Sequence, residues 1–110
     1  MLEISFADKS LRTLSENRAK AEAAFGIEPA VRLQRRLADL RAANNINDLV
    51  DGSYTKGTEG NENKIIFYLS DDIKMIITPN HMVIPTLRTG KTDWKKVRRV
   101  KVIEIQNHKK

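Results

Sequence analysis

The sequence predicts one α+β domain over residues 1–110, in which an N-terminal strand precedes an antiparallel helix pair packed on one face of a small antiparallel β-sheet. Apolar residues alternate with polar ones near the N-terminus, recur at helical spacing between residues 9 and 44, and form short β-branched runs beyond residue 63. A strand, then helices, then a series of strands is an order typical of α+β domains. A chain of 110 residues forms one modest core, and the absence of cysteine excludes disulfides and thiolate metal sites.

The first half of the chain predicts one strand and two helices. Residues 2–6 alternate between apolar and polar side chains, and Asp8 is the expected N-cap of a helix over residues 9–25. Gly26 ends this helix, and a second helix over residues 28–44 begins with Glu and Pro, which suit a helix N-terminus. Because the turn is so short, we expect the two helices to lie antiparallel. Beside the apolar stripe of the second helix lie basic side chains that we interpret as a solvated face rather than a phosphate site, namely Arg32, Arg35 and Arg36.

The second half predicts a β-hairpin and a terminal strand. Residues 64–69 and 73–78 are apolar runs separated by Ser-Asp-Asp, which indicates a hairpin. The first run is apolar on both faces, so we expect it to be the central strand. A long connection over residues 79–93 leads to a final strand within residues 94–108, rich in Val and Ile.

The net charge of the chain is concentrated near its C-terminus. Residues 88–101 carry seven basic side chains and one carboxylate, a net of plus six, which equals the formal charge of the whole chain. One interpretation is a polyanion-binding segment, because a concentrated field attracts polyanions more strongly than dispersed charge. The other is a solvated edge strand, in which Lys and Arg block pairing with other chains. The basic residues of this segment are Arg88, Lys91, Lys95, Lys96, Arg98, Arg99 and Lys101.

Composition also narrows the class of protein. The N-terminal ten residues have neither the basic region nor the apolar region of a secretory signal, and the longest apolar run, residues 65–69, is far shorter than the roughly 20 residues of a membrane span. We therefore expect a soluble, cytoplasmic protein without a membrane partner. Aromatic residues make up only 5% of the chain, which disfavours an extended base-stacking surface.

Several segments together resemble the RelE superfamily of bacterial toxins, and the best match is its HigB-like branch, the plasmid maintenance system killer proteins. The resemblance covers nearly the whole chain and follows the order of the predicted elements. The segments that carry it are RLQRRLADLRAA, Asn47-Asp48-Leu49-Val50, Lys56-Gly57, Pro79-Asn80-His81 and DWKKVRRVKVIEIQNH.

The resemblance implies the toxin of a type II toxin–antitoxin system, which enters the ribosomal A site and cuts mRNA without a metal or other cofactor. It also implies an antitoxin encoded next to it, commonly one with a helix-turn-helix domain. The chain departs from the family pattern in three places. Of the family loop His-Pro-Leu-Lys-Gly-Asp-Arg only Lys56-Gly57 remains, Lys74 stands where the family has Arg, and Gln106-Asn107 replaces Asp-Tyr before His108.

These residues define the expected site. A histidine imidazole titrates near neutral pH, so His108 is the candidate base or acid, and Lys74 is the cation expected beside it if the last strand runs antiparallel to residues 73–78. The alternative for His108 is a frayed residue near the chain end, and we expect His81 only to order its turn. Basic side chains expected to bind RNA are Lys56, Lys95, Lys96, Arg98 and Arg99.

The departures also leave a binding function open. A RelE-fold toxin can act on another target, as gyrase-binding relatives do, or a decayed toxin can retain only its antitoxin. A general RNA-binding module is a third and weaker possibility, for which a steep salt dependence without toxicity would be diagnostic.

Overall fold

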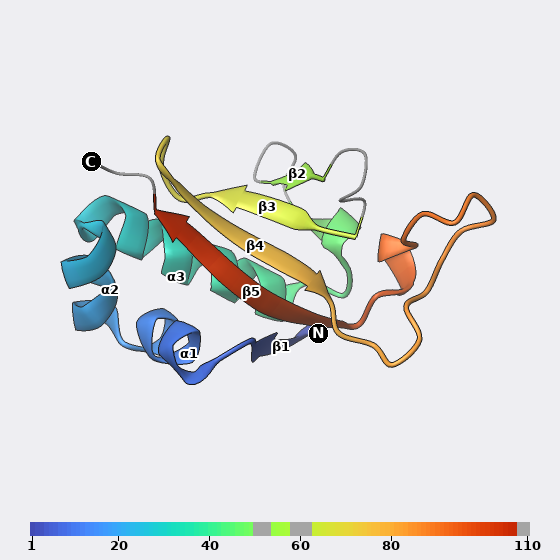
Figure 1. The fold of residues 1–110 in the computed structure, drawn as a ribbon, viewed down its shortest axis with the longest axis horizontal. Coiled ribbons are helices and arrows are strands. Elements are labelled where there is room, and N and C mark those ends of the chain that lie inside the picture. The colour runs from blue at the N-terminus through green and yellow to red at the C-terminus, as the bar shows by residue number, and fades with distance from the viewer. Residues whose placement is uncertain (50–53, 58–62, 108–110) are drawn as a thin grey trace.

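The computed structural model describes residues 1–49, 54–57 and 63–107, and over these ranges it has three α-helices and one five-stranded sheet (Figure 1). This confirms the α+β class. In chain order the elements are β1 (Glu3–Phe6), α1 (Lys9–Glu16), α2 (Arg18–Phe25), α3 (Ile27–Ala42), β2 (Thr55–Lys56), β3 (Ile65–Tyr68), β4 (Ile73–Pro79) and β5 (Arg99–Asn107), with short 3₁₀ helices at Ile46–Asp48 and Trp94–Lys96.

The sheet is mixed, which corrects the prediction of an antiparallel one. Its strand order is β1-β5-β4-β3-β2, and β1 runs parallel to β5 while the other neighbouring pairs are antiparallel. The helices separate β1 from the later strands, so the chain can return β5 alongside β1 in the same direction.

The strand order corrects one further prediction and excludes one of the two interpretations of the basic segment. The central strand is β4 and not residues 64–69, because β3 lies one position from the edge and its Tyr68 is 44% exposed. The basic terminal strand lies between β1 and β4, so it is an interior strand and its charges do not protect a free sheet edge. It spans Arg99–Asn107, within the predicted range of residues 94–108.

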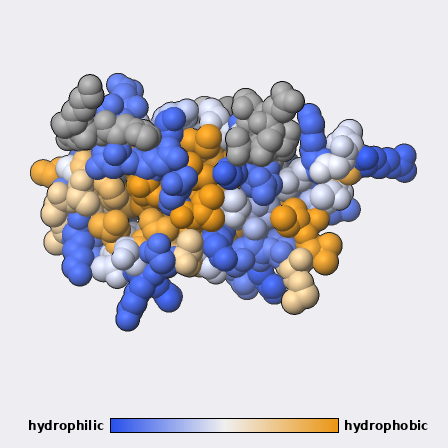
Figure 2. Space-filling model, in the orientation of Figure 1, coloured by the Kyte–Doolittle hydropathy of each residue, from blue (hydrophilic) through white to orange (hydrophobic). Residues whose placement is uncertain are grey.

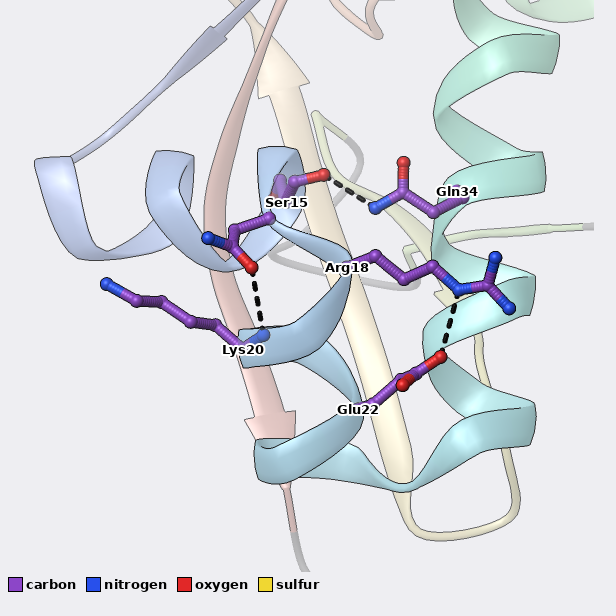
Figure 3. Close-up of polar contacts among 6 residues, drawn as sticks. Ser15, Arg18, Lys20, Glu22 and Gln34 are labelled. Carbon is purple, nitrogen blue, oxygen red and sulfur yellow. Dashed lines mark hydrogen bonds and ion pairs between the residues drawn. The ribbon is translucent and has the colours of Figure 1, made fainter.

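The helix predicted over residues 9–25 is broken at Asn17. The Asn17 backbone is extended, and its side-chain Oδ1 accepts a hydrogen bond from the Lys20 amide at 3.1 Å, which caps the start of α2. The reversal into α3 occurs at Gly26, whose φ of 93° suits glycine. As Figure 3 shows, α2 and α3 then run antiparallel, as predicted.

The helices cover one face of the sheet, with the main core between the two layers (Figure 1). Leu33, Leu37 and Leu40 of α3 are fully buried in the same cluster as Ile73 and Met75 of β4. Burying side chains of this size contributes roughly 1.5–3 kcal/mol each, so this layer is the main source of stability. No α-helix of the described residues covers the opposite face of the sheet, which faces the viewer in Figures 1 and 2.

The long connection after β4 is tied back to the start of β5. The Asn80 amide donates to the Arg99 carbonyl at 2.8 Å. His81 Nε2 accepts from the amides of Arg98 and Arg99 at 3.0 and 3.2 Å, so His81 orders this turn, as predicted. Beyond the turn, Met82 and Val83 are exposed.

Candidate functional site

The helix-free face of the sheet is defined by alternation along the strands. Ile73, Met75 and Ile77 of β4 lie in the core with the helices, so the residues between them face the other way. Directly paired antiparallel residues share a face, and Figure 2 shows an apolar band flanked by hydrophilic side chains on this surface. The residues that pairing assigns to this face on β3, β4 and β5 are Ile66, Tyr68, Lys74, Ile76, Thr78, Lys101, Glu104 and Gln106.

A β-bulge decides which residues near the end of β5 lie on this face. Ile77 pairs with Val102 and Ile76 pairs with Glu104, so Ile103 is an extra residue without a partner. The shift places Ile105 against the core and leaves Glu104 on the helix-free face. Without the bulge, uninterrupted alternation would direct the Glu104 carboxylate into the core, where an unpaired charge is costly.

Lys74 occupies the middle of a row that crosses three strands. It pairs with Tyr68 on β3 and with Gln106 on β5, and its ammonium lies 5.5 Å from the centroid of the Tyr68 ring. The ring face stabilises a cation at this distance by about 0.5–1 kcal/mol at an exposed site. The Lys74 charge is therefore held on the sheet surface beside a partly exposed phenol.

The antiparallel pairing of β4 with β5 places the end of β5 beside Ile73 and Lys74, as expected, because Asn107 pairs with Ile73. His108 itself lies outside the described residues. Tyr68 was missed in the sequence analysis. The available signal was its position as a polar-tipped residue at the end of an apolar strand, from which hairpin pairing leads to Lys74.

Lys56 lies away from Lys74 and on the other side of the sheet. It pairs with Ile65, which is buried in the core, so Lys56 shares the helix-side face. Along β3, Ile65 is three residues from Tyr68, the partner of Lys74, an offset of about 10 Å along the strand. These two lysines do not converge on one phosphate.

No family model matches the chain, and neither a curated protein nor a solved structure similar to it was found. Family membership therefore stays a prediction. Among the described residues, no helix is long and apolar enough to cross a membrane.

The remaining RNA-binding candidates lie at the other end of β5. This strand of nine residues spans about 26 Å, and Arg99 begins it while Gln106 lies near its end. The Arg99 guanidinium lies 3.2 Å from the Glu3 carboxylate, and the Arg98 guanidinium donates to the Lys95 carbonyl at 2.7 Å. Lys95 and Lys96 are exposed on the 3₁₀ helix Trp94–Lys96.

Two groups of site residues result. Lys74, with Tyr68 and Gln106, lies at the hairpin end of the helix-free face. The basic group lies at the other end of β5, and only its Arg99 and Lys101 share the face of Lys74. Lys101 pairs with Thr78, which lies on that face, and Arg99 lies on the same face because it is two residues before Lys101 in the strand. Lys101 was not among the expected site residues.

Proposed function

We propose that the protein is the toxin of a type II toxin–antitoxin system, a HigB-like member of the RelE superfamily that acts as a ribosome-dependent, metal-independent mRNA endoribonuclease. The observation that carries the proposal is Lys74, held between Tyr68 and Gln106 on the helix-free face, beside the end of the strand that leads to His108. The cytoplasm, the ribosome with its mRNA, and an antitoxin of helix-turn-helix type from the adjacent gene are the corresponding location and partners.

The chemistry needs no metal in this proposal. The ribose 2′-oxygen attacks the adjacent phosphorus, its proton passes to a base, and the 5′-oxygen leaves with a proton from an acid, giving a 2′,3′-cyclic phosphate. The Lys74 ammonium stabilises the charge that develops on the phosphorane oxygens. His108 serves as base or acid, and the Tyr68 phenol is a second group able to donate a proton.

Substrate binding is the task of the basic group. Lys101 adds a positive charge on the face of Lys74, with the Glu104 carboxylate between the two rows, and the Arg99 guanidinium on that face is paired with Glu3. Lys95, Lys96 and Arg98 lie around the start of β5. Contacts of this kind hold the sugar-phosphate backbone and carry no base preference of their own.

The test is expression of the chain without its antitoxin, followed by mapping of mRNA ends. Wild-type protein should arrest growth and cut transcripts within codons. His108→Ala and Lys74→Ala should each lower cleavage about a hundredfold, the lower end of the usual contribution of proton transfer for His108 and of electrostatic stabilisation for Lys74. Lys20→Ala is the matched control, because it removes one exposed positive charge from the helix layer. Growth arrest with intact transcripts contradicts the proposal.

A second candidate is a RelE-fold toxin that acts by binding, on a gyrase-type target, or a catalytically decayed toxin that only binds its antitoxin. The observation that favours it is the separation of Lys56 from Lys74, which leaves Lys74 as the one expected cation beside the end of β5 in the described part of the chain. Toxicity that survives the double variant Lys74→Ala/His108→Ala would support this second candidate.

A further inference from the structure

The sheet has a free edge at β1. This strand pairs with β5 on one side, and no strand of the described residues pairs with its other side (Figure 1). The amides of Glu3 and Ala7 donate to carbonyls of the neighbouring chain segment at β5, at 3.0 and 2.9 Å. Because successive residues of a strand direct their backbone groups to opposite sides, the N–H and C=O groups of Ile4 and Phe6 point away from the sheet.

Backbone hydrogen bonds close both ends of this free edge. The Leu2 amide donates to the Ala43 carbonyl at 3.0 Å, and the Asp8 carbonyl accepts from the Arg12 amide at 3.3 Å. The segment Glu3–Phe6 also contains no Pro, Lys or bulge, the devices that commonly block an edge strand. Its outward backbone groups are therefore suited to pairing with another strand.

A second copy of β1, running antiparallel, fits these groups in one register. When Ile4 lies opposite Phe6 of the second copy, the two residues exchange both backbone hydrogen bonds, and Ser5 lies opposite Ser5 of the second copy on a two-fold axis. A shift by two residues in either direction would place a free group opposite Leu2 or Asp8, which already use backbone groups within the chain.

The side chains at the edge suit the same register. Ile4 and Phe6 are half-buried on the helix side, where they pack against the core, so each would lie beside the other across the new pair. Contacts between an aromatic and a β-branched residue stabilise antiparallel pairs. A groove of about 460 Å³ beside the strand offers room for the second copy, and its lining residues are Ile4, Ser5, Phe6, Asp8, Lys9 and Arg12.

The charges at this edge favour a second copy over a polyanion. Glu3 and Asp8 balance Lys9 and Arg12, whereas the whole chain carries a formal charge of +6. Glu3 is also paired with Arg99 at 3.2 Å, and Arg12 with Glu16 at 3.3 Å. Two copies can therefore approach along a neutral part of an otherwise basic surface.

We propose that two copies of this chain associate through antiparallel pairing of β1, with Ser5 at the two-fold axis, so that their five-stranded sheets become one. The inference does not rest on the proposed function. Lys74 lies on β4, which is separated from β1 by β5, so the pairing leaves the Lys74 row accessible.

Disulfide trapping tests the register. The chain has no cysteine, so Ser5→Cys introduces a single thiol at an exposed position, with loss of the long 3.4 Å contact from Asn80 Nδ2. Residues opposite each other in a non-hydrogen-bonded pair have Cα atoms about 4.5 Å apart, within disulfide range. Mild oxidation should convert Ser5→Cys to a covalent dimer, whereas Ser10→Cys, exposed on α1, should remain monomeric.

Sedimentation equilibrium of the full chain measures the association itself. Wild-type protein should show a monomer–dimer equilibrium between micromolar and millimolar concentration. Ser5→Asp places two carboxylates opposite each other and should raise the dissociation constant about fivefold, the upper end of the effect of one cross-strand pair. Ser10→Asp is the matched control. It lowers the positive charge of each copy equally, so it should not weaken association.

Three results would overturn the proposal. Wild-type protein that stays monomeric at millimolar concentration would leave the edge to a strand of another protein. Equal rates of trapping in Ser5→Cys and Ser10→Cys would indicate random collision. A dimer with the same dissociation constant in wild type and Ser5→Asp would place the contact elsewhere. None of these measurements depends on RNA cleavage, so a failure of the nuclease proposal is distinguishable from a failure of this one.

Discussion

Ser15 shows how one buried hydroxyl can weaken the helix layer. The residue is 1% exposed and its Oγ has no hydrogen-bond partner, while its carbonyl accepts from Gln34 Nε2 at 2.7 Å (Figure 3). The Ser15 carbonyl therefore makes the stabilising hydrogen bond, whereas the buried Ser15 hydroxyl is a desolvated polar group that lowers the stability of the fold.

Replacing Ser15 with Ala should therefore stabilise the protein. The change removes the unpaired hydroxyl, keeps the bond from Gln34 and improves helix propensity, so the free energy of unfolding should rise by about 1 kcal/mol. Urea denaturation measures it. Ser10→Ala, on the exposed surface of the same helix, is the control for propensity alone, and equal effects of the two changes would contradict the role of burial.

His81 illustrates a residue whose task is structural although histidine suggests chemistry. Its Nε2 accepts from two successive amides at the start of β5, so in this geometry that nitrogen carries no proton. It holds Arg98 and Arg99 in place and thereby fixes where the basic end of the strand begins. Its place in the sequence, directly after Pro79-Asn80, was sufficient to predict this ordering role.

Among the secondary-structure elements, helices α1 and α2 are separated by the single residue Asn17. Its side chain caps α2 and its own amide donates to the Thr13 carbonyl at 2.9 Å, so one residue ends the first helix and begins the second. Asn17→Ala should lower the free energy of unfolding by about 1 kcal/mol, because the cap is lost. Thermal unfolding tests this, with Asn17→Asp as a variant that keeps the cap. A stability loss of the same size in Asn17→Asp would show that capping is not the cause.

The elements that could be predicted are those with a local signal. The leucine stripe of α3, the hairpin of β3 and β4, and the turn at Gly26 all follow from neighbouring residues. The break at Asn17 also had a local signal, since Asn favours helix caps, but the Ala-rich sequence after it favoured one continuous helix.

Strand order had no local signal. Whether β1 joins β5 in parallel, and which strand is central, depends on pairing between residues distant in the sequence. The bulge did leave a trace, because the core residues Val100, Val102 and Ile105 are spaced by two and then by three. An interrupted alternation of this kind indicates an extra residue in the strand.

The candidate site, like the fold, was predicted only in part from the sequence. Pairing of the last strand with residues 73–78 correctly placed the end of β5 beside Lys74. The position of Lys56 on the other face depends on the parity of its pairing with Ile65, which a two-residue strand does not reveal in the sequence. Tyr68 was missed for a related reason, since its role depends on which residue lies opposite.

For the whole molecule, the main consequence is that charge and candidate chemistry lie at opposite ends. The molecule extends 44 Å along its longest axis, and β5 connects the basic end to the end that carries Lys74. Binding affinity and cleavage should therefore respond to different substitutions. Under the proposed function, we expect the basic end to set the salt dependence of RNA binding, because each phosphate that it neutralises would release counterions.

The double variant Lys95→Gln/Lys96→Gln tests this separation. Both lysines are exposed on the 3₁₀ helix beside the start of β5, so neutralising them should leave the fold intact. The slope of the logarithm of affinity for a single-stranded oligonucleotide against the logarithm of salt concentration should fall by about 1.4, at roughly 0.7 per phosphate contact.

The matched control for this variant is Lys9→Gln/Lys20→Gln, which removes the same charge from exposed positions in the helix layer. If the two double variants lower the slope equally, binding depends on net charge and the basic end has no special role. If only Lys95→Gln/Lys96→Gln lowers it, the oligonucleotide contacts the surface next to Trp94. Fluorescence anisotropy at four or more salt concentrations, with Lys74 unchanged, measures this contact independently of cleavage.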